Sequence, residues 1–207
     1  NTFRESYPEW PLPASLCVYP NFASVVAKER KCDVNITVVS ACFPSSQSFL
    51  EVKLKECELA VENGADEVDI VLALNAFLAG DYESAAEEIR QVRSCIDAVA
   101  ARQNRKVHLK VILETGLLRT PEKIAQASFL AMEAGADFIK TSTGKVDVNA
   151  TPAAAYVMCE CISKFHAATG RKIGFKPAGG ISSAADALCY YSIVSAILGK
   201  DWLNKEL

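Results

Sequence analysis

The sequence predicts an α/β fold, a TIM (β/α)8 barrel of which six βα units are evident. Short runs rich in Val and Ile alternate along the chain with longer stretches of helical periodicity, which is typical of βαβ units around a parallel sheet. The segment Glu62–Asp66 reads Glu-Asn-Gly-Ala-Asp, and Glu133–Asp137 reads Glu-Ala-Gly-Ala-Asp. Each copy ends a predicted helix and leads into a predicted strand, so the echo indicates a repeated structural unit.

Size and charge narrow the class of protein. The chain has 207 residues, of which 50% are hydrophobic, so we predict a single domain over residues 1–207 with one buried core. A formal net charge of -3 and the lack of a basic run argue against nucleic-acid binding. No apolar run approaches the roughly 20 residues that cross a bilayer, and residues 1–10 lack the apolar core of a signal peptide. We expect a cytoplasmic protein that acts on small molecules.

Cysteine and histidine usage argues against a metal or nucleotide cofactor. The eight cysteines are scattered without a CxxC motif, which favours reduced core thiols in a reducing compartment. The two histidines form no HExxH motif, so a hydrolytic zinc site is not expected. Neither GxGxxG nor a P-loop follows a predicted strand. We therefore predict an enzyme without metal or cofactor.

Six strands are predicted from short apolar or β-branched runs that end at Gly, Pro or polar residues. They cover residues 14–19, 34–43, 67–72, 107–115, 138–142 and 172–176. Pro44 ends the second strand, and Pro177 with the pair Gly179-Gly180 ends the sixth.

The helices between these strands are predicted from caps and periodicity. Thr120 and Thr151 each precede a proline, which is a capping residue followed by proline at the first helical position. Ser45–Ser48 and Ser182 or Ser183 are the other predicted caps. The predicted helices cover residues 2–7, 20–27, 49–63, 82–101, 121–134, 152–168 and 184–197, with a short turn at 202–207.

Alternation within the strands places charged residues in the barrel interior. Residues facing the outer helices must be apolar, so the polar residues between them face the lumen. By this pattern six ionisable residues point inward, together with Cys17: Lys110, Lys140, Lys176, Glu67, Asp69 and Glu114. Buried ions are costly even when paired, so stability alone does not explain six of them. The pattern favours a catalytic centre, although a structural lysine paired with a buried carboxylate also fits Lys140 alone.

This set of charges suits Schiff-base chemistry. A lysine amine that loses its proton near neutral pH is a nucleophile towards a carbonyl, and a neighbouring ammonium promotes that loss. We predict that Lys140 is the neutral nucleophile and Lys176 the charged neighbour, with Asp69 holding Lys176 protonated and relaying a proton. Lys110 and Glu114 are predicted to pair behind them and fix the other two, a role that is equally compatible with simple structural support.

Two glycine-bearing loops follow the strands that carry these lysines. Gly144 and Lys145 follow the fifth strand, and Gly179 and Gly180 follow the sixth. In α/β barrels, the loops that follow the last strands commonly bind phosphate through backbone amides and an ammonium group. Plain turns would use the same glycines. We expect Lys145 to contact phosphate rather than to act as a nucleophile, because it lies beyond the strand end.

Five segments together resemble the signature sequences of the deoxyribose-phosphate aldolase family. They are Phe138–Lys145, Gly174–Gly180, Gly64–Val71, Leu109–Thr115 and Cys17–Pro20, and the similarity runs in order from about Ala14 to Trp202. The resemblance implies a class I Schiff-base lyase that reversibly splits 2-deoxy-D-ribose 5-phosphate into acetaldehyde and D-glyceraldehyde 3-phosphate, in the breakdown of deoxynucleosides. Such an enzyme needs no cofactor, and a homodimer is one assembly compatible with it.

The resemblance also assigns roles to single residues. Lys140 matches the Schiff-base lysine, Lys176 the second catalytic lysine, and Asp69 the proton-relay aspartate. The two glycine loops match phosphate-binding positions. Cys17 matches a cysteine that lines the pocket, where a buried, unreactive thiol is the simpler expectation.

The chain departs from the family at its ends. An eight-fold barrel needs eight strands, and we predict that the family's first strand and its last, phosphate-binding strand are absent here. We therefore expect either part of a longer chain or an open barrel.

Two other functions fit the same residues. A different Schiff-base barrel, such as a transaldolase-like or other class I aldolase, would use the same lysines. A non-catalytic sugar-phosphate binding protein would keep the loops without using the amines.

Overall fold

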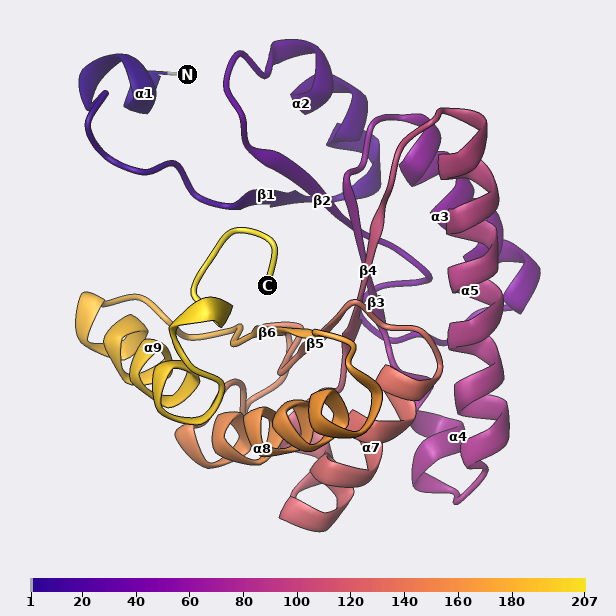
Figure 1. The fold of residues 1–207 in the computed structure, drawn as a ribbon. Helices are drawn as coiled ribbons and strands as arrows, with labels where there is room; N and C mark the ends of the chain where they lie inside the picture. Colours follow the sequence, from indigo (N-terminus) through magenta and orange to yellow (C-terminus); the bar gives the residue numbers. More distant parts are fainter. Residues whose placement is uncertain (1) are drawn as a thin grey trace.

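The computed structural model describes residues 2–207 and contains one sheet of six parallel strands in the order of the sequence (Figure 1). The strands are β1 (Ser15–Val18), β2 (Asn35–Val39), β3 (Glu67–Val71), β4 (His108–Ile112), β5 (Phe138–Lys140) and β6 (Gly174–Lys176). The predicted α/β class and all six predicted strands are confirmed, each observed strand being somewhat shorter than its prediction. Consecutive parallel strands require crossover connections, which the helices supply.

The helices lie between the strands in sequence. They are α1 (Thr2–Ser6), α2 (Ala23–Glu29), α3 (Leu50–Glu62), α4 (Leu74–Leu78), α5 (Tyr82–Arg102), α6 (Thr115–Leu118), α7 (Pro121–Glu133), α8 (Pro152–Thr169) and α9 (Ala184–Ile197), with 3-10 turns η1 (Pro20–Phe22) and η2 (Lys200–Trp202). The caps at Thr120, Thr151 and Ser183 are confirmed, since each side chain accepts a hydrogen bond from the third amide of its helix.

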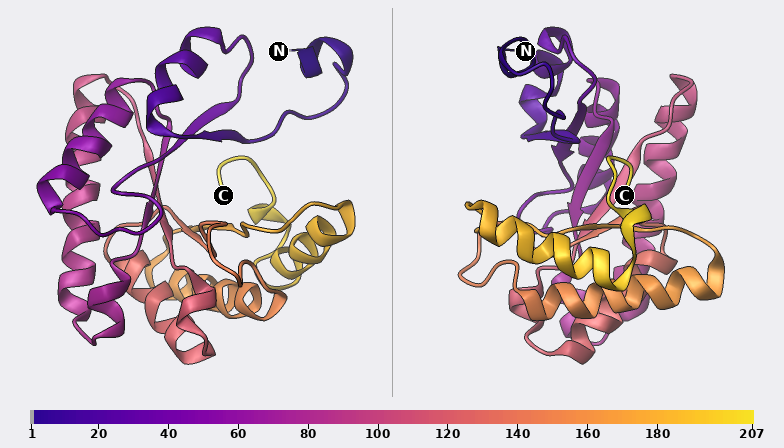
Figure 2. Two further views of the ribbon diagram at one scale, coloured as in Figure 1. Left: turned by 180° about the vertical axis from the view of Figure 1, so that it is seen from behind. Right: turned by 60° about the vertical axis from the view of Figure 1, so that its left-hand side comes forward.

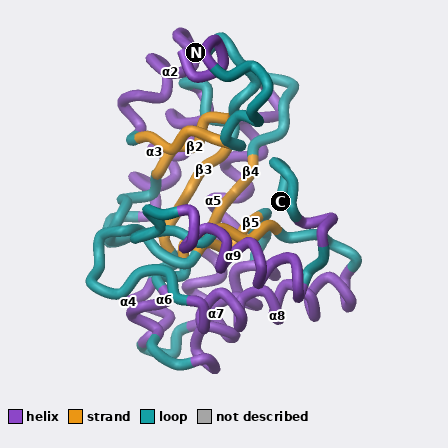
Figure 3. Tube along the Cα trace, turned by 90° about the vertical axis from the view of Figure 1, so that its left-hand side faces the viewer, coloured by secondary structure: helices purple, strands orange, loops and turns teal. Residues whose placement is uncertain are grey.

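The sheet curls, and the longer helices cover its outer side (Figures 1 and 3). Helices α3, α5, α7, α8 and α9 pack successively against one another around this side. Apolar residues of the strands point towards these helices and form the core, among them Val68, Val111 and Ile139. No α-helix of residues 2–207 covers the inner, concave side, and the curled sheet resembles part of a barrel wall open between β1 and β6 (Figure 2).

The C-terminal residues lie on the concave side. Lys205 forms an ion pair of 2.7 Å with Asp33, which precedes β2. Trp202 is anchored by a hydrogen bond of 2.9 Å from its ring Nε1 to the carbonyl oxygen of Ile173. A cavity of about 280 Å³ between this tail and the sheet is lined by residues that include Glu67, Lys110 and Lys176. None of the helices described over residues 2–207 has the length and apolar character of a membrane span.

Three local predictions were wrong. The serines of Ser45–Ser48 do not cap α3, which begins at Leu50 after the uncapped Phe49. The Ser46 hydroxyl is instead engaged with Lys53 and Glu88 in a buried contact between α3 and α5. The short helices α4 and α6 were not predicted, because the residue before each of them provides no side-chain cap. At the start of α3 and at these two short helices, tertiary contacts override the local sequence signal.

Candidate active site

The predicted catalytic residues meet on the concave side of β3, β4, β5 and β6. Strand register pairs Asp69 with Lys110 and Lys140 with Lys176. Asp69 is fully buried and Lys140 is 5% exposed. Because side chains alternate along a strand, these residues share one face, while the residues between them pack against the helices. The inward orientation predicted for the strand residues is therefore what the structure shows.

The closest contact within this group joins Lys140 and Asp69. Lys140 Nζ donates a hydrogen bond of 2.7 Å to Asp69 Oδ2. The other carboxylate oxygen, Oδ1, is buried without a hydrogen bond and lies 3.8 Å from Lys110 Nζ. Asp69 is thus an anion shared between two ammonium groups, with one oxygen still able to accept a proton or a hydrogen bond.

Lys110 belongs to a second buried network beside this one. Its Nζ forms an ion pair with Glu67 and a 3.1 Å hydrogen bond to Thr37 Oγ1. Asn35 also donates to Glu67, at 3.1 Å. The predicted pair of Lys110 with Glu114 is wrong: Glu114 lies beyond the end of β4, so the two side chains leave the strand in different places. The partner of Lys110 comes from the neighbouring strand.

The sequence predicted a charged Lys176 beside a neutral Lys140, whereas Lys176 is the lysine whose pKa is lowered in the structure. Burial lowers the pKa of Lys176, Asp69 opposes this shift, and the nearby ammonium groups of Lys140 and Lys110 lower the pKa further. The predicted contact of Asp69 with Lys176 is not formed as an ion pair in residues 2–207, since Asp69 is bonded to Lys140. The charge of Lys140 is thus one of the causes of the lowered pKa of Lys176.

Cys17 reaches the same group of charges from β1. Burial raises the pKa of the Cys17 thiol and Asp69 raises it further, against the lowering effect of the lysines. The thiol is therefore protonated at neutral pH and is a poor nucleophile. The residue as a whole is exposed rather than buried, which corrects the expectation of a buried thiol.

Glu114 holds the loop that follows Lys140. Its backbone is left-handed, with φ of 54°, which turns the chain away from β4. Its carboxylate accepts hydrogen bonds from the Thr143 amide at 3.2 Å and the Thr143 hydroxyl at 2.5 Å. Thr143 Oγ1 in turn accepts from the Lys145 amide at 3.1 Å. Glu114 thus fixes the first part of the 141–151 loop.

The two glycine loops lie side by side. Gly144, Gly179 and Gly180 all have positive φ, a conformation that side chains disfavour. A Cβ atom built on Gly144 would lie 4.0 Å from Gly179 Cα, which places the loops in contact distance. The exposed side chain of Lys145 makes no ion pair within residues 2–207.

Thr141 joins the two loops, although no motif in the sequence pointed to this role. Its hydroxyl accepts a 2.9 Å hydrogen bond from the Ala178 amide and lies 3.2 Å from the Ala178 carbonyl oxygen. Thr141 directly follows β5 and is β-branched like Ile139 and Thr143, so only the pairing of β5 with β6 distinguishes it. The predicted site residues are therefore brought together with one addition, Thr141, and with different partners for Asp69, Lys110 and Glu114.

A family model described as DeoC/LacD family aldolase matches residues 10–190, which include both lysine strands and both glycine loops. The chain belongs to this aldolase family. Human deoxyribose-phosphate aldolase is 46% identical over 198 residues, which are 94% of this chain and 59% of the human protein. The Bos taurus deoxyribose-phosphate aldolase is 43% identical over 198 residues, which are again 94% of this chain and 59% of the relative. The chain thus spans about three fifths of the length of these curated relatives.

Solved structures of aldolases share the fold of this family member. One described as QR15, an aldolase, superposes with a TM-score of 0.75 and is 32% identical, covering 87% of this chain and 73% of that one. The DeoC/LacD match spans all six strands and ends within α9, so the curled sheet is the part of an aldolase barrel that carries the lysines.

Proposed function

We propose that this chain carries the catalytic lysines of a class I aldolase that reversibly cleaves 2-deoxy-D-ribose 5-phosphate to acetaldehyde and D-glyceraldehyde 3-phosphate. The observation that carries the proposal is the buried contact of Lys140 with Asp69 beside a second lysine whose pKa is lowered, in a chain of an aldolase family. Chemical identity of the substrate follows from the relatives that are named deoxyribose-phosphate aldolase.

The first step is attack of Lys140 on the aldehyde carbon of the open-chain sugar. Attack requires a free lone pair on Nζ, and Asp69 Oδ2, at 2.7 Å, accepts the proton that must leave. Lys176, whose pKa is lowered, is a second amine that can accept this proton. The carbinolamine then loses water, and the product is a protonated imine on Lys140.

The imine acts as an electron sink for carbon-carbon cleavage. The hydroxyl on C3 of the sugar loses its proton, the C2–C3 bond breaks, and its electrons move onto the imine to form an enamine. D-glyceraldehyde 3-phosphate leaves. Protonation of the enamine at C2 restores the imine, and water releases acetaldehyde. We assign the proton transfers to Asp69 and Lys176, since Asp69 Oδ1 is without a hydrogen bond and the lowered pKa of Lys176 lets it lose its proton at a lower pH than an ordinary lysine.

Phosphate recognition is assigned to the paired loops. The amides around Gly144, Gly179 and Gly180 and the unpaired ammonium of Lys145 supply donors and positive charge to a phosphate at the carboxyl ends of β5 and β6. Glu114 positions the first loop through Thr143, and Lys110 Nζ lies 3.8 Å from Asp69 Oδ1. Cys17 lines the site as a neutral thiol.

Reductive trapping tests the proposal. The chain is incubated with acetaldehyde and borohydride, which converts an imine on a lysine into a stable ethylamine, and the labelled protein is quantified by intact mass. We expect one ethyl group per chain with acetaldehyde, and with 2-deoxyribose 5-phosphate the reduced sugar imine or its two-carbon remnant on the same lysine. A transaldolase-like enzyme would instead be trapped by a ketose phosphate and not by the two-carbon aldehyde. Absence of labelling by either compound would leave a sugar-phosphate binding protein as the better account.

Location and assembly are part of the same proposal. Eight free thiols suit a reducing compartment such as the cytoplasm. Leu188 and Tyr191 expose apolar surface on α9, which supports a homodimer that light scattering would detect.

A further inference from the structure

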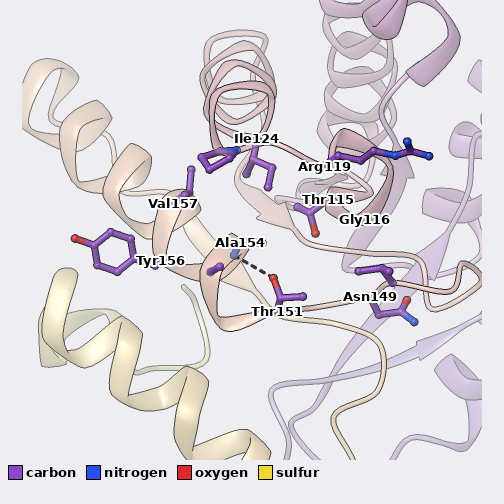
Figure 4. Close-up of a pocket in the computed structure, with 12 residues that line it drawn as sticks. Thr115, Gly116, Arg119, Ile124, Asn149, Thr151, Ala154, Tyr156 and Val157 are labelled. Atoms are coloured by element: carbon purple, nitrogen blue, oxygen red, sulfur yellow. Dashed lines mark hydrogen bonds between the residues drawn. The ribbon is translucent and has the colours of Figure 1, made fainter.

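A second cavity lies outside the charged face, between the starts of α7 and α8 (Figure 4). Its volume is about 530 Å³, within the range of pockets that hold small molecules. It contains none of the residues assigned above to catalysis or phosphate binding. Its lining residues are Thr115, Gly116, Arg119, Pro121, Ile124, Val148, Asn149, Thr151, Ala153, Ala154, Tyr156 and Val157.

The first sign of a ligand is an unpartnered hydroxyl. Thr115 is 4% exposed, and its Oγ1 is buried without a hydrogen-bond partner. In Figure 4 this hydroxyl points from α6 towards the beginning of α8, where Thr151 and Ala154 lie. Nearly all buried polar groups in proteins are hydrogen-bonded, so this one is expected to find its partner in a bound molecule.

The second sign is the charge of the lining. Arg119 is the one charged residue among the twelve, and it makes no ion pair within residues 2–207. Helix α8 begins at the cavity, and Ala153 in its first turn lines it. The positive end of this 18-residue helix and a free guanidinium both favour an anion. No acidic side chain opposes it.

The remaining wall is apolar. Ile124 and Val157 face the cavity from α7 and α8, and Val148 and Tyr156 leave half of their surface exposed at its rim. An inorganic anion would gain nothing from contact with this apolar wall. A ligand with an apolar group would bury that group against it, and burial of apolar area favours binding.

We propose that this cavity binds a small carboxylate with an apolar body, such as an aromatic or branched-chain acid. The carboxylate is placed at the Thr115 hydroxyl, and the apolar body lies against Ile124 and Val157. The exposed Arg119 side chain extends away from Thr115 in Figure 4 and turns towards the cavity to meet the carboxylate. A single guanidinium and one hydroxyl match a monoanion better than a phosphate dianion.

Occupancy of the cavity bears on the loop that follows Lys140. Val148, Asn149 and Thr151 line the cavity and belong to the 141–151 loop. Asn149 also packs against the second loop, since a Cβ on Gly179 would lie 2.6 Å from its amide oxygen. A bound acid therefore rigidifies the segment that joins the two glycine loops. This regulatory consequence rests on the proposed function, whereas binding itself does not.

The test uses phenylacetate as the probe and residue-resolved NMR as the readout. We expect saturable shifts at Ala154 and Val157, and much weaker binding of the neutral phenylacetamide. Arg119→Gln is expected to weaken phenylacetate binding about tenfold, and Thr115→Val by a smaller factor. Arg119 is exposed, so its replacement leaves the fold intact; Arg102→Gln, an exposed arginine at the end of α5, is the matched control and should not change binding.

Three results would overturn the proposal. They are the absence of saturable shifts, equal affinities of the wild-type and Arg119→Gln proteins, and displacement of phenylacetate by inorganic phosphate, which would place the probe in the barrel. None of these measurements depends on lysine chemistry. Failure here and failure of imine trapping are therefore separate outcomes.

Discussion

Two buried lysine–carboxylate pairs in this molecule have the same length and different surroundings. Lys53 Nζ lies 2.7 Å from Glu88 Oε2, between α3 and α5, and Lys140 Nζ lies 2.7 Å from Asp69 Oδ2, on the concave side of the sheet. In the first pair Ser46 contacts both the ammonium and the second oxygen of Glu88. In the second pair Asp69 Oδ1 has no hydrogen bond, and two further lysines stand nearby.

The difference separates a structural pair from a reactive one. A single ammonium paired with a single carboxylate, with their hydrogen bonds satisfied, is stabilised in its charged form. Three lysines sharing two carboxylates, Glu67 and Asp69, leave an excess proton that is easily lost. The contact distance alone therefore does not reveal reactivity, and the balance of neighbouring charges does.

The largest expected effect is the loss of imine formation in Lys140→Leu. Without Lys140, Asp69 Oδ1 still has the Lys110 ammonium 3.8 Å away as a neighbouring positive charge. The variant should therefore remain folded. Ethyl labelling by acetaldehyde and borohydride should fall to background, while far-UV circular dichroism stays unchanged. The matched variant Lys53→Met should retain labelling wherever it is folded. Unfolding of Lys140→Leu would show that this lysine is structural.

The next effect concerns stability. Lys53→Met leaves the mostly buried Glu88 without its cation, so we expect a loss of about 3 kcal/mol in the free energy of unfolding. Urea denaturation measures it. A loss in Lys140→Leu as large as that in Lys53→Met would erase the distinction between the two pairs.

A third prediction follows from the charges around Lys176. In Lys140→Leu one ammonium that lowers the pKa of Lys176 is removed, and Asp69, which raises it, loses its closest partner. Both changes favour protonation, so the pKa of Lys176 should rise. Carbon-13 NMR of methylated lysines reports this titration. Lys53→Met is expected to leave the pKa of Lys176 unchanged. A lower pKa of Lys176 in the Lys140→Leu protein would contradict the proposed effect of Lys140 on Lys176.

The smallest effect is expected at Glu114. Glu114→Gln keeps the size of the side chain and weakens its hydrogen bonds to Thr143, which loosens the 141–151 loop. Binding of inorganic phosphate, followed by calorimetry, should weaken about fivefold, with imine labelling by acetaldehyde retained. Equal loss of labelling and phosphate binding would place Glu114 in the chemistry instead of the loop.

Much of the fold could be predicted because local signals agree with it. The capping residues Thr120, Thr151 and Ser183 and the alternation in β3 to β5 led to the right helices and the right inward faces. The site residues were predicted by type and side of the sheet. Their partners were not: Asp69 contacts Lys140 across β4, and Lys110 contacts Glu67, which depends on strand register.

The remaining differences have the same origin. Glu114 was assigned to a strand that stops at Ile112, because a left-handed turn at a non-glycine residue has no clear sequence signal. Thr141 and the cavity between α7 and α8 arise from residues distant in sequence. Ser46 was predicted as a cap and serves a buried ion pair instead.

The most direct measurement is peptide mapping of the wild-type chain after trapping with acetaldehyde and borohydride. Our account predicts one ethyl group on the peptide that contains Lys140, with Lys110 and Lys176 unmodified. Ethylation of Lys176 in place of Lys140, or labelling spread over exposed lysines such as Lys145, would contradict it.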